Sequence, residues 1–443
     1  MELRAPTPHV ERQPRAEAGA EAQLARAASS WDWDTPRKDL ADLARLREQH
    51  PLMLEPVASP DGERVAAIVG QDDGTFRVWV NGEPWEGSYE KARGLAFAPD
   101  GRLVALVRAD DEWTVAVDGL PWEERFTFAW NLRFSEEGRA IAVQVKRDMD
   151  YSVAVNGKAW ETSFLSCRDL ALGADGKTVV ALVQVEAVPE GDIAKFVDGA
   201  WSVAVNGEAW TRRFVGVWAP AIGRQGAHVA VEARTSRLDY TVAEDGVPWE
   251  TTWSCVWEPR YRPGGAAVVP VRAAGAWTLV EGGAPLWRGQ YVQLWQERVS
   301  PDGGRIAAVV APSFGRWTIA VDDRPWAARF SELVGEPVFS PDGRHVAAMV
   351  KDEGRWSIAV DGAVWREDFE MVWDPVFSPD GRTAVAKVKL GGAFTVALNG
   401  RVWPRRFEAL RDPVFGPDGQ KLLLRCVEGG RYTRLVVPLE KLL

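Results

Sequence analysis

Apolar and polar positions recur along this chain in a four-part pattern that is clearest between residues 337 and 373. Runs of apolar residues alternating with small or polar ones are typical of strands, and Asp361-Gly362 between two such runs is typical of a two-residue hairpin. The pattern predicts four antiparallel strands, at 337–340, 345–350, 356–360 and 365–373.

The turn Ser-Pro-Asp-Gly and its variants repeat this unit ten times from about residue 52 to the end of the chain. The turn glycines are Gly62, Gly101, Gly138, Gly176, Gly226, Gly264, Gly303, Gly343, Gly381 and Gly419. Four antiparallel strands in about 39 residues make up one blade of a β-propeller. We therefore predict an all-β propeller of about ten repeats, as one wide ring or two smaller propellers in tandem. The absence of a linker between units favours one ring.

The hairpin turns between the third and fourth strands are mostly Asn-Gly or Asp-Gly pairs, such as Asn81-Gly82 and Asn399-Gly400. Such turns require a positive φ at both central residues, which these residue types tolerate. The pair Asp322-Asp323 is an exception that predicts a positive φ at Asp323.

A tryptophan follows each of nine hairpins, and an aromatic residue comes four positions later. One strand cannot bury such a stripe alone, so we expect these rings to pack between neighbouring blades. Tryptophan can also stack on sugars or carry electrons by hopping between rings. Neither role is needed to explain a tryptophan in every repeat, because a functional site would require it in one place only. The predicted inter-blade residues are Trp85, Trp122, Trp160, Trp210, Trp249, Trp287, Trp326, Trp365 and Trp403.

The two ends of the chain depart from the repeat. Residues 1–30 have the composition of a disordered segment, and residues 31–51 are expected to hold a latch strand and a short helix. The tenth unit lacks a fourth strand, and residues 30–34 resemble the end of one. We therefore predict that this N-terminal segment, 30–34, completes the last blade, and that 37–49 forms the helix.

The formal charge of −10 disfavours nucleic acid and anionic membranes as partners. No run of eighteen apolar residues is present, which argues against membrane insertion, and the N-terminus has no apolar core typical of a secretory signal. Three widely spaced cysteines do not make a disulfide framework and fit a reducing, cytoplasmic location.

Candidate chemistry is scarce. The chain contains four histidines, of which His228 and His345 occupy equivalent second-strand positions and are expected to pack or to line an edge. Cys-x-x-Cys, Gly-x-Ser-x-Gly, P-loop and Rossmann patterns are absent from the sequence. We therefore predict that the protein is not an enzyme, and we assign no catalytic, cofactor-binding or metal-binding residue.

The fourth unit carries an insertion at about residues 186–199, between its second and third strands. Insertions in repeat proteins map to loops on one face and often carry binding. We predict partner contact at Val188, Pro189, Glu190, Asp192 and Phe196.

The Ser-Pro-Asp-Gly-Arg turn before an apolar strand resembles WD40-like (PD40, TolB-type) repeats over nearly the whole chain from residue 52. The repeated aromatic-x-Val-x-Val-Asn/Asp-Gly-x-x-Trp element, with 23 tryptophans, is similar to the tryptophan-rich WD40-like subunits of Tmc transmembrane electron-transfer complexes of sulfate-reducing bacteria. This resemblance implies a cytoplasmic subunit without cofactors, peripheral to the inner face of the membrane through its partners. Those partners would be a heterodisulfide-reductase-like iron–sulfur subunit and a membrane cytochrome b subunit, with a periplasmic multihaem cytochrome c in the complex. The Gly-His and Trp-Asp signatures of standard WD40 repeats are missing from their usual places.

Two classes of function remain open on these grounds. The first is a non-catalytic interaction scaffold of an electron-transfer complex, and the alternative is a stand-alone ligand- or glycan-binding propeller.

Overall fold

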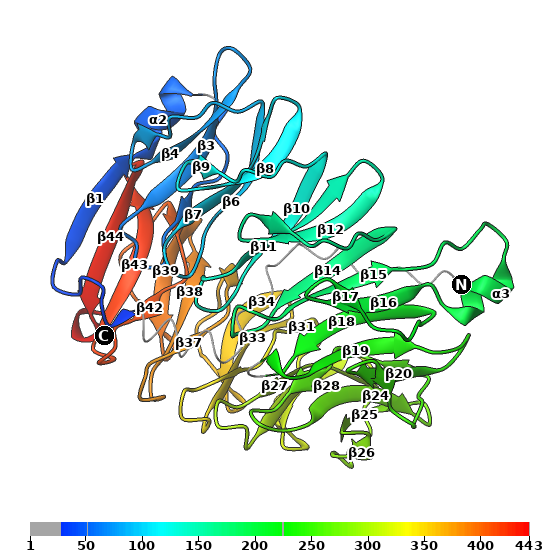
Figure 1. Cartoon of the computed structure of the whole chain (residues 1–443). Coiled ribbons are helices and arrows are strands. Elements are labelled where there is room, and N and C mark those ends of the chain that lie inside the picture. The colour runs from blue at the N-terminus through cyan, green and yellow to red at the C-terminus, as the bar shows by residue number, and fades with distance from the viewer. Residues whose placement is uncertain (1–27, 51, 224–225, 443) are drawn as a thin grey trace.

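The computed structural model describes residues 28–50, 52–223 and 226–442 and contains ten antiparallel sheets, each built around four consecutive strand positions. The sheets follow one another around a ring like the blades of a fan (Figure 1). The protein is therefore a ten-bladed β-propeller, as the repeat predicts.

The second and third strands of each blade are the longest and most regular. The second strands are β3 (Val65–Gly70), β7 (Leu103–Ala109), β11 (Ile141–Arg147), β15 (Val179–Gln184), β19 (Val229–Arg234), β24 (Ala267–Ala273), β28 (Ile306–Ser313), β33 (Val346–Asp352), β38 (Ala384–Leu390) and β43 (Lys421–Glu428). The third strands are β4 (Phe76–Val80), β8 (Glu112–Val117), β12 (Asp150–Val155), β16 (Trp201–Val205), β20 (Tyr240–Glu244), β25 (Ala276–Glu281), β29 (Arg316–Val321), β34 (Arg355–Val360), β39 (Ala393–Leu398) and β44 (Arg431–Pro438). The second strands are buried on both faces because each blade is covered on both sides.

The first strands are interrupted by a bulge or split in two. The continuous ones, each with a register shift, are β6 (Lys91–Phe97), β10 (Phe128–Phe134), β14 (Ser166–Leu172), β18 (Gly216–Ile222) and β27 (Gln293–Val299). The split ones are β22 (Cys255–Val256) with β23 (Arg260–Tyr261), β31 (Leu333–Val334) with β32 (Val338–Phe339), β36 (Met371–Val372) with β37 (Val376–Phe377), and β41 (Ala409–Leu410) with β42 (Val414–Phe415). Blade 1 has β2 (Val57–Ala58) and a single bridge from Met53 to Val69.

In blades 1 to 9 the fourth strands are two residues long, which corrects the prediction of a strand over 365–373. They are β5 (Glu83–Pro84), β9 (Leu120–Pro121), β13 (Lys158–Ala159), β17 (Glu208–Ala209), β21 (Val247–Pro248), β26 (Ala284–Pro285), β30 (Arg324–Pro325), β35 (Ala363–Val364) and β40 (Arg401–Val402). After β35 the chain touches the third strand again at one bridge, Phe369 to Trp356. Met371 then begins the first strand of the next blade, β36. The segment 365–373 therefore leaves one sheet and enters the next.

The hairpin turns have the predicted backbone. Asn81 has a φ of 50°, and its Oδ1 accepts a hydrogen bond from Val65 N at 2.8 Å. Asp323 has a φ of 65°, which confirms the prediction for the exceptional pair. Its carboxylate accepts hydrogen bonds from Arg288 N at 2.8 Å and Tyr291 Oη at 3.0 Å, both in the segment that leads from blade 6 to blade 7. The aspartate thus joins two blades where other repeats use glycine.

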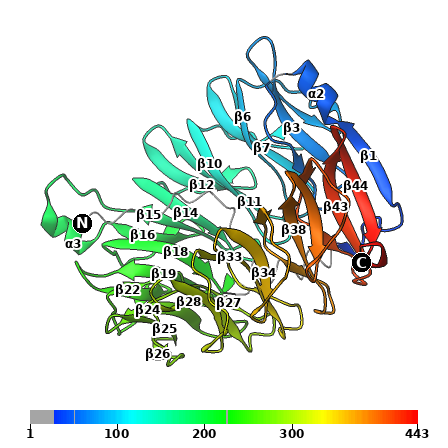
Figure 2. The same cartoon turned by 180° about the vertical axis from the view of Figure 1, so that it is seen from behind.

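The ring closes through a strand from the N-terminal segment. β1 (Arg37–Asp42) pairs antiparallel with β44 and is the outermost strand of the tenth blade, and helix α2 (Leu43–Gln49) follows it. In the views of Figure 1 and Figure 2, β1 lies beside β44 and near the C-terminus. The N-terminal segment therefore completes the last blade as predicted, but with Arg37–Asp42 and not residues 30–34, and the helix begins at Leu43 rather than 37. Predicted disorder of residues 1–30 falls mostly outside the described residues.

Side chains join several blades to the next by donating to the carbonyl of its Ser-Pro-Asp-Gly turn glycine, and a tyrosine makes a hydrogen bond of this kind from the last blade to the first. Arg64 Nη1 donates to Gly101 O at 3.0 Å, and Arg305 Nη1 donates to Gly343 O at 3.1 Å. Tyr432 Oη of blade 10 donates to Gly62 O of blade 1 at 3.1 Å. The repeats therefore form one ring, and not two propellers in tandem.

Candidate functional site

The insertion of blade 4 folds into a short helix at the end of the β15–β16 hairpin. Its base is closed by a hydrogen bond from Val185 N to Ala200 O at 2.8 Å. Helix α3 (Ile193–Asp198) is capped by Asp192, whose Oδ1 accepts from Lys195 N at 3.0 Å. Gly199 ends it with a φ of 89°, where a Cβ would lie 2.6 Å from the backbone of Phe214. The insertion therefore has a defined shape and stands away from the ring beside β15 and β16 (Figure 1).

The five predicted contact residues all lie on this insertion. Pro189 and Glu190 are exposed, Val188 and Asp192 are half-buried, and the Phe196 side chain is 45% exposed. Sequence reasoning missed Ile193, which is 76% exposed, and the exposed Val197. Ile193, Phe196 and Val197 stand at positions i, i+3 and i+4, which share one face of a helix. This spacing is the sequence signal that could have identified Ile193 and Val197.

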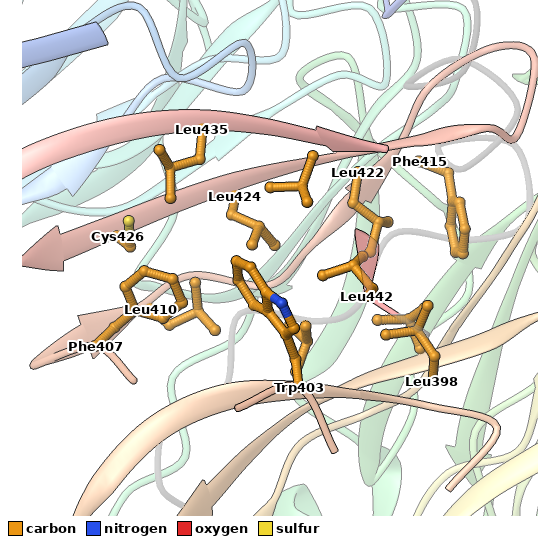
Figure 3. Packing of buried hydrophobic residues seen from close by; sticks show 13 residues of the cluster. Leu398, Trp403, Phe407, Leu410, Phe415, Leu422, Leu424, Cys426, Leu435 and Leu442 are labelled. Atoms are coloured by element: carbon orange, nitrogen blue, oxygen red, sulfur yellow. The ribbon is translucent and has the colours of Figure 1, made fainter. Parts of the chain in front are cut away.

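Seven of the nine tryptophans of the repeat, all except Trp287 and Trp403, lie against the hairpin glycine of the following blade. Trp287, Trp326 and Trp403 are buried and the other six are half-buried. A Cβ on Gly362 would lie 3.1 Å from Trp326, and one on Gly119 would lie 3.4 Å from Trp85. Trp403, at the end of blade 9, faces the last blade, which has no such turn, and packs beside Leu398, Leu424 and Leu442 (Figure 3). None of the nine lines the pocket described below.

A second set of aromatic contacts joins the first and third strands within a blade. Trp257 stacks on Trp277 with 5.3 Å between ring centroids, and Trp295 lies 4.8 Å from Trp317. In blade 4 an arginine takes the first-strand place, and the Arg168 guanidinium lies 3.9 Å from the centre of the Trp201 ring. These ring–ring and cation–ring contacts stabilise each blade by joining its first and third strands over the second strand.

His228, His345, Cys167 and Cys426 occupy structural positions. His228 Nδ1 lies 2.7 Å from Asp245 Oδ2, which raises the pKa of His228, and His345 makes the same contact with Asp361 at 2.6 Å. Burial raises the pKa of Cys167 to about 11 and that of Cys426 to about 12, so both stay thiols at neutral pH. In the described part of the chain, no three His, Cys, Asp or Glu side chains are grouped so that they could hold a metal ion.

Glu297 is an ionisable group that the sequence did not single out. It is 2% exposed, and its Oε1 has no hydrogen-bond partner among the described residues. Burial raises its pKa to about 8, opposed by Arg260 and Arg298 and assisted by Glu258. Glu297 therefore holds a proton in the folded ring at neutral pH.

Replacing this residue (Glu297→Gln) is expected to remove a pH dependence of stability. The unfolded glutamate loses its proton near pH 4.5 and the folded one near pH 8, so wild-type stability falls as pH rises between these values. The loss across this window is roughly 2–5 kcal/mol, and the glutamine variant lacks it. Denaturant midpoints at pH 5, 6.5 and 8 measure the difference, with the exposed Glu190→Gln as control. Parallel curves for wild type and Glu297→Gln contradict the prediction.

An open pocket of about 500 Å³ lies beside the closing strand, where the N-terminal segment meets the turns of blades 1 and 2. Its walls include Trp31, Asp32, Lys38, Glu63 and Asp100. Lys38 Nζ lies 2.8 Å from Asp32 and 2.7 Å from Glu63, which lowers the pKa of Asp32 and raises that of Lys38. The pocket thus combines one aromatic wall with several acceptor groups.

Helices in the described residues are all too short or too polar to cross a lipid bilayer.

Comparison with known proteins adds limited information. No protein-family model matches the chain, and no curated protein matches it. Solved structures that resemble it include a eukaryotic initiation factor (13% identity, 80% of this chain and 95% of that one, TM-score 0.45). Others are TolB from Acinetobacter baumannii (15%, 61% and 77%, TM-score 0.30) and a structure from a study of two prolyl endopeptidases (11%, 67% and 54%, TM-score 0.36). At these values the neighbours carry no functional argument. The propeller architecture follows from the chain's own ten sheets.

Proposed function

We propose that this protein is a non-catalytic interaction scaffold and that the insertion of blade 4 contacts its partner. The observation that carries the proposal is helix α3, which exposes Ile193, Phe196 and Val197 on an otherwise regular ring. Apolar side chains are costly to leave in water and are typical of the centre of protein interfaces. Extensive packing between blades gives this helix a rigid support.

The finer proposal follows the resemblance of the tryptophan-rich repeat. The scaffold would belong to a membrane-associated electron-transfer complex on the cytoplasmic side. It would bind a heterodisulfide-reductase-like iron–sulfur subunit, and through it a membrane cytochrome b subunit, and would itself bring no cofactor.

Affinity purification of the tagged protein from detergent-solubilised native membranes tests both the scaffold function and the membership of an electron-transfer complex. The wild type is expected to retain an iron–sulfur subunit, visible by its absorption and by mass spectrometry. Deletion of residues 187–198 is expected to release this subunit while leaving the unfolding midpoint unchanged. Removal of Asp72 and Asp73, which are exposed in the corresponding turn of blade 1, serves as the control for shortening a loop. Recovery of the wild-type chain alone contradicts the scaffold.

The pocket beside β1 favours a second candidate, the binding of a small polar ligand such as a glycan. Trp31 offers a ring face, and Asp32, Glu63 and Asp100 offer acceptors for hydroxyl groups. A glycan array tests this function, with Trp31→Ala as the matched variant. Retention that is equal for both proteins, or no selective retention, contradicts it.

A further inference from the structure

The turns between second and third strands all emerge on one side of the ring, which we call the loop rim. Several of these turns are held by the segment that enters the same blade: Asp111 N donates to Glu90 Oε1 at 3.2 Å, and Gly392 N donates to Glu370 Oε1 at 3.1 Å. The Ser-Pro-Asp-Gly turns and the hairpins lie at the other ends of the strands. The insertion of blade 4 therefore shares the loop rim with nine equivalent turns.

Three consecutive blades carry apolar tips on this rim, and a fourth tip, Phe314 in the turn of blade 7, lies apart from them and is 93% exposed. Met149 in the turn of blade 3 is 76% exposed, and Leu238 in that of blade 5 is 75% exposed. Between them lies α3 with Ile193, Phe196 and Val197, all exposed. We call these five residues the apolar sector. The corresponding turns of blades 1 and 2 carry Asp72-Asp73 and Asp110-Asp111 instead.

Carboxylates surround the apolar sector. Asp148 and Asp150 flank Met149, and Glu190 and Asp198 flank the apolar face of α3; all four are exposed. In the described residues no ion pair is recorded for these four side chains. Residues 147–150, 190–198 and 235–239 contain six carboxylates and three cations, Arg147, Lys195 and Arg237, so the balance of charge there is negative.

We propose that the apolar sector binds an apolar ridge bordered by lysine or arginine on a protein partner, as an amphipathic basic helix would present. This inference rests on the proposed scaffold function and names the chemistry of its partner. Apolar tips supply the buried centre of such an interface, and the carboxylates pair with cations at its rim and speed association. A second copy of this chain would bring like charges together, and an anionic membrane would be repelled.

A synthetic 18-residue helix of leucine and lysine, carrying a photo-cross-linker and a fluorophore, is the probe. A matched peptide with glutamate in place of lysine is the control. Binding is expected for the lysine peptide, weakening with salt, with cross-links in 147–150, 190–198 and 235–239. Phe196→Ala is expected to raise the dissociation constant at least about tenfold. Leu120→Ala, at a residue 76% exposed on the opposite rim, is expected to change it less than twofold.

Equal binding of both peptides, cross-links elsewhere, or no binding overturns the proposal. So does sedimentation of the protein with phosphatidylglycerol or phosphatidylcholine vesicles, or a dimer that Phe196→Ala dissociates. Failure of the peptide-binding test is distinguishable from failure of the affinity purification that tests the scaffold. A partner retained from membranes without peptide binding removes this inference and leaves the scaffold standing.

Discussion

Replacing Arg434 with methionine (Arg434→Met) is expected to lower the free energy of unfolding by about 3–5 kcal/mol, because two backbone carbonyls and the half-buried Glu63 carboxylate then lose a charged, buried donor. Arg434 lies on β44 and is 0% exposed. Its Nε lies 2.9 Å from Asp61 O and 3.1 Å from Glu63 Oε1 of blade 1, and its Nη2 donates to Asp32 O. One side chain thus joins the last blade, the first blade and the segment before the closing strand. Urea denaturation followed by tryptophan fluorescence measures the change.

Arg431→Met is the matched control, since Arg431 lies on the same strand but is exposed. Its Nε lies 3.9 Å from Asp42, and an exposed pair at this distance contributes about 0–1 kcal/mol. A loss for Arg434→Met no larger than that for Arg431→Met shows that the arginine does not hold the ring closed.

The repeat could be predicted from sequence because it is local. Each unit of about 39 residues contains its own turn residues and its own alternation of apolar and polar positions. Short-range rules therefore predict the Asn81-Gly82 hairpin and the positive φ of Asp323. The fourth strand was overestimated because the aromatic spacing after Trp365 continues without a break into the next blade. Spacing along one chain does not show where it leaves one sheet and enters another.

The closing strand was misplaced for a different reason. Trp31 and Trp33 resemble the aromatic motif at the end of a repeat, whereas Arg37–Asp42 is polar and resembles a helix start. An outermost strand needs backbone pairing and few apolar contacts, so its sequence carries a weak signal. The strand is recognised by the hydrogen bonds that β44 offers, which depend on the complete ring.

The candidate site was predicted in part. The insertion was found because it breaks the period, but the neighbouring tips Met149 and Leu238 are single residues in turns of ordinary length. Their common placement arises from the ring, which brings three consecutive turns to one rim. Glu297 and Arg434 were not identified for a similar reason, since the burial of a charged residue depends on the adjacent blade.

Trp326→Ala is expected to destabilise the protein by about 3–5 kcal/mol, as removal of a buried aromatic side chain leaves a cavity. Trp326 is 9% exposed and packs with Phe330 and Val346 between blades 7 and 8. The control Trp257→Ala removes a ring that is 42% exposed, and its cost is expected to be lower, about 1–2 kcal/mol.

A double-mutant cycle with Gly362 shows whether this energy comes from the contact between blades. Gly362→Ala alone is destabilising, because the residue has a φ of 83° and its new Cβ would lie 3.1 Å from Trp326. In the double variant Trp326→Ala/Gly362→Ala the ring is gone and the methyl group has room, although the strain of the positive φ remains. The double variant is therefore expected to lose less stability than the two single losses combined, by about 0.5 kcal/mol or more. Additive losses would mean that the Trp326 ring and the next blade's hairpin are energetically independent, and that the tryptophan column does not join the blades.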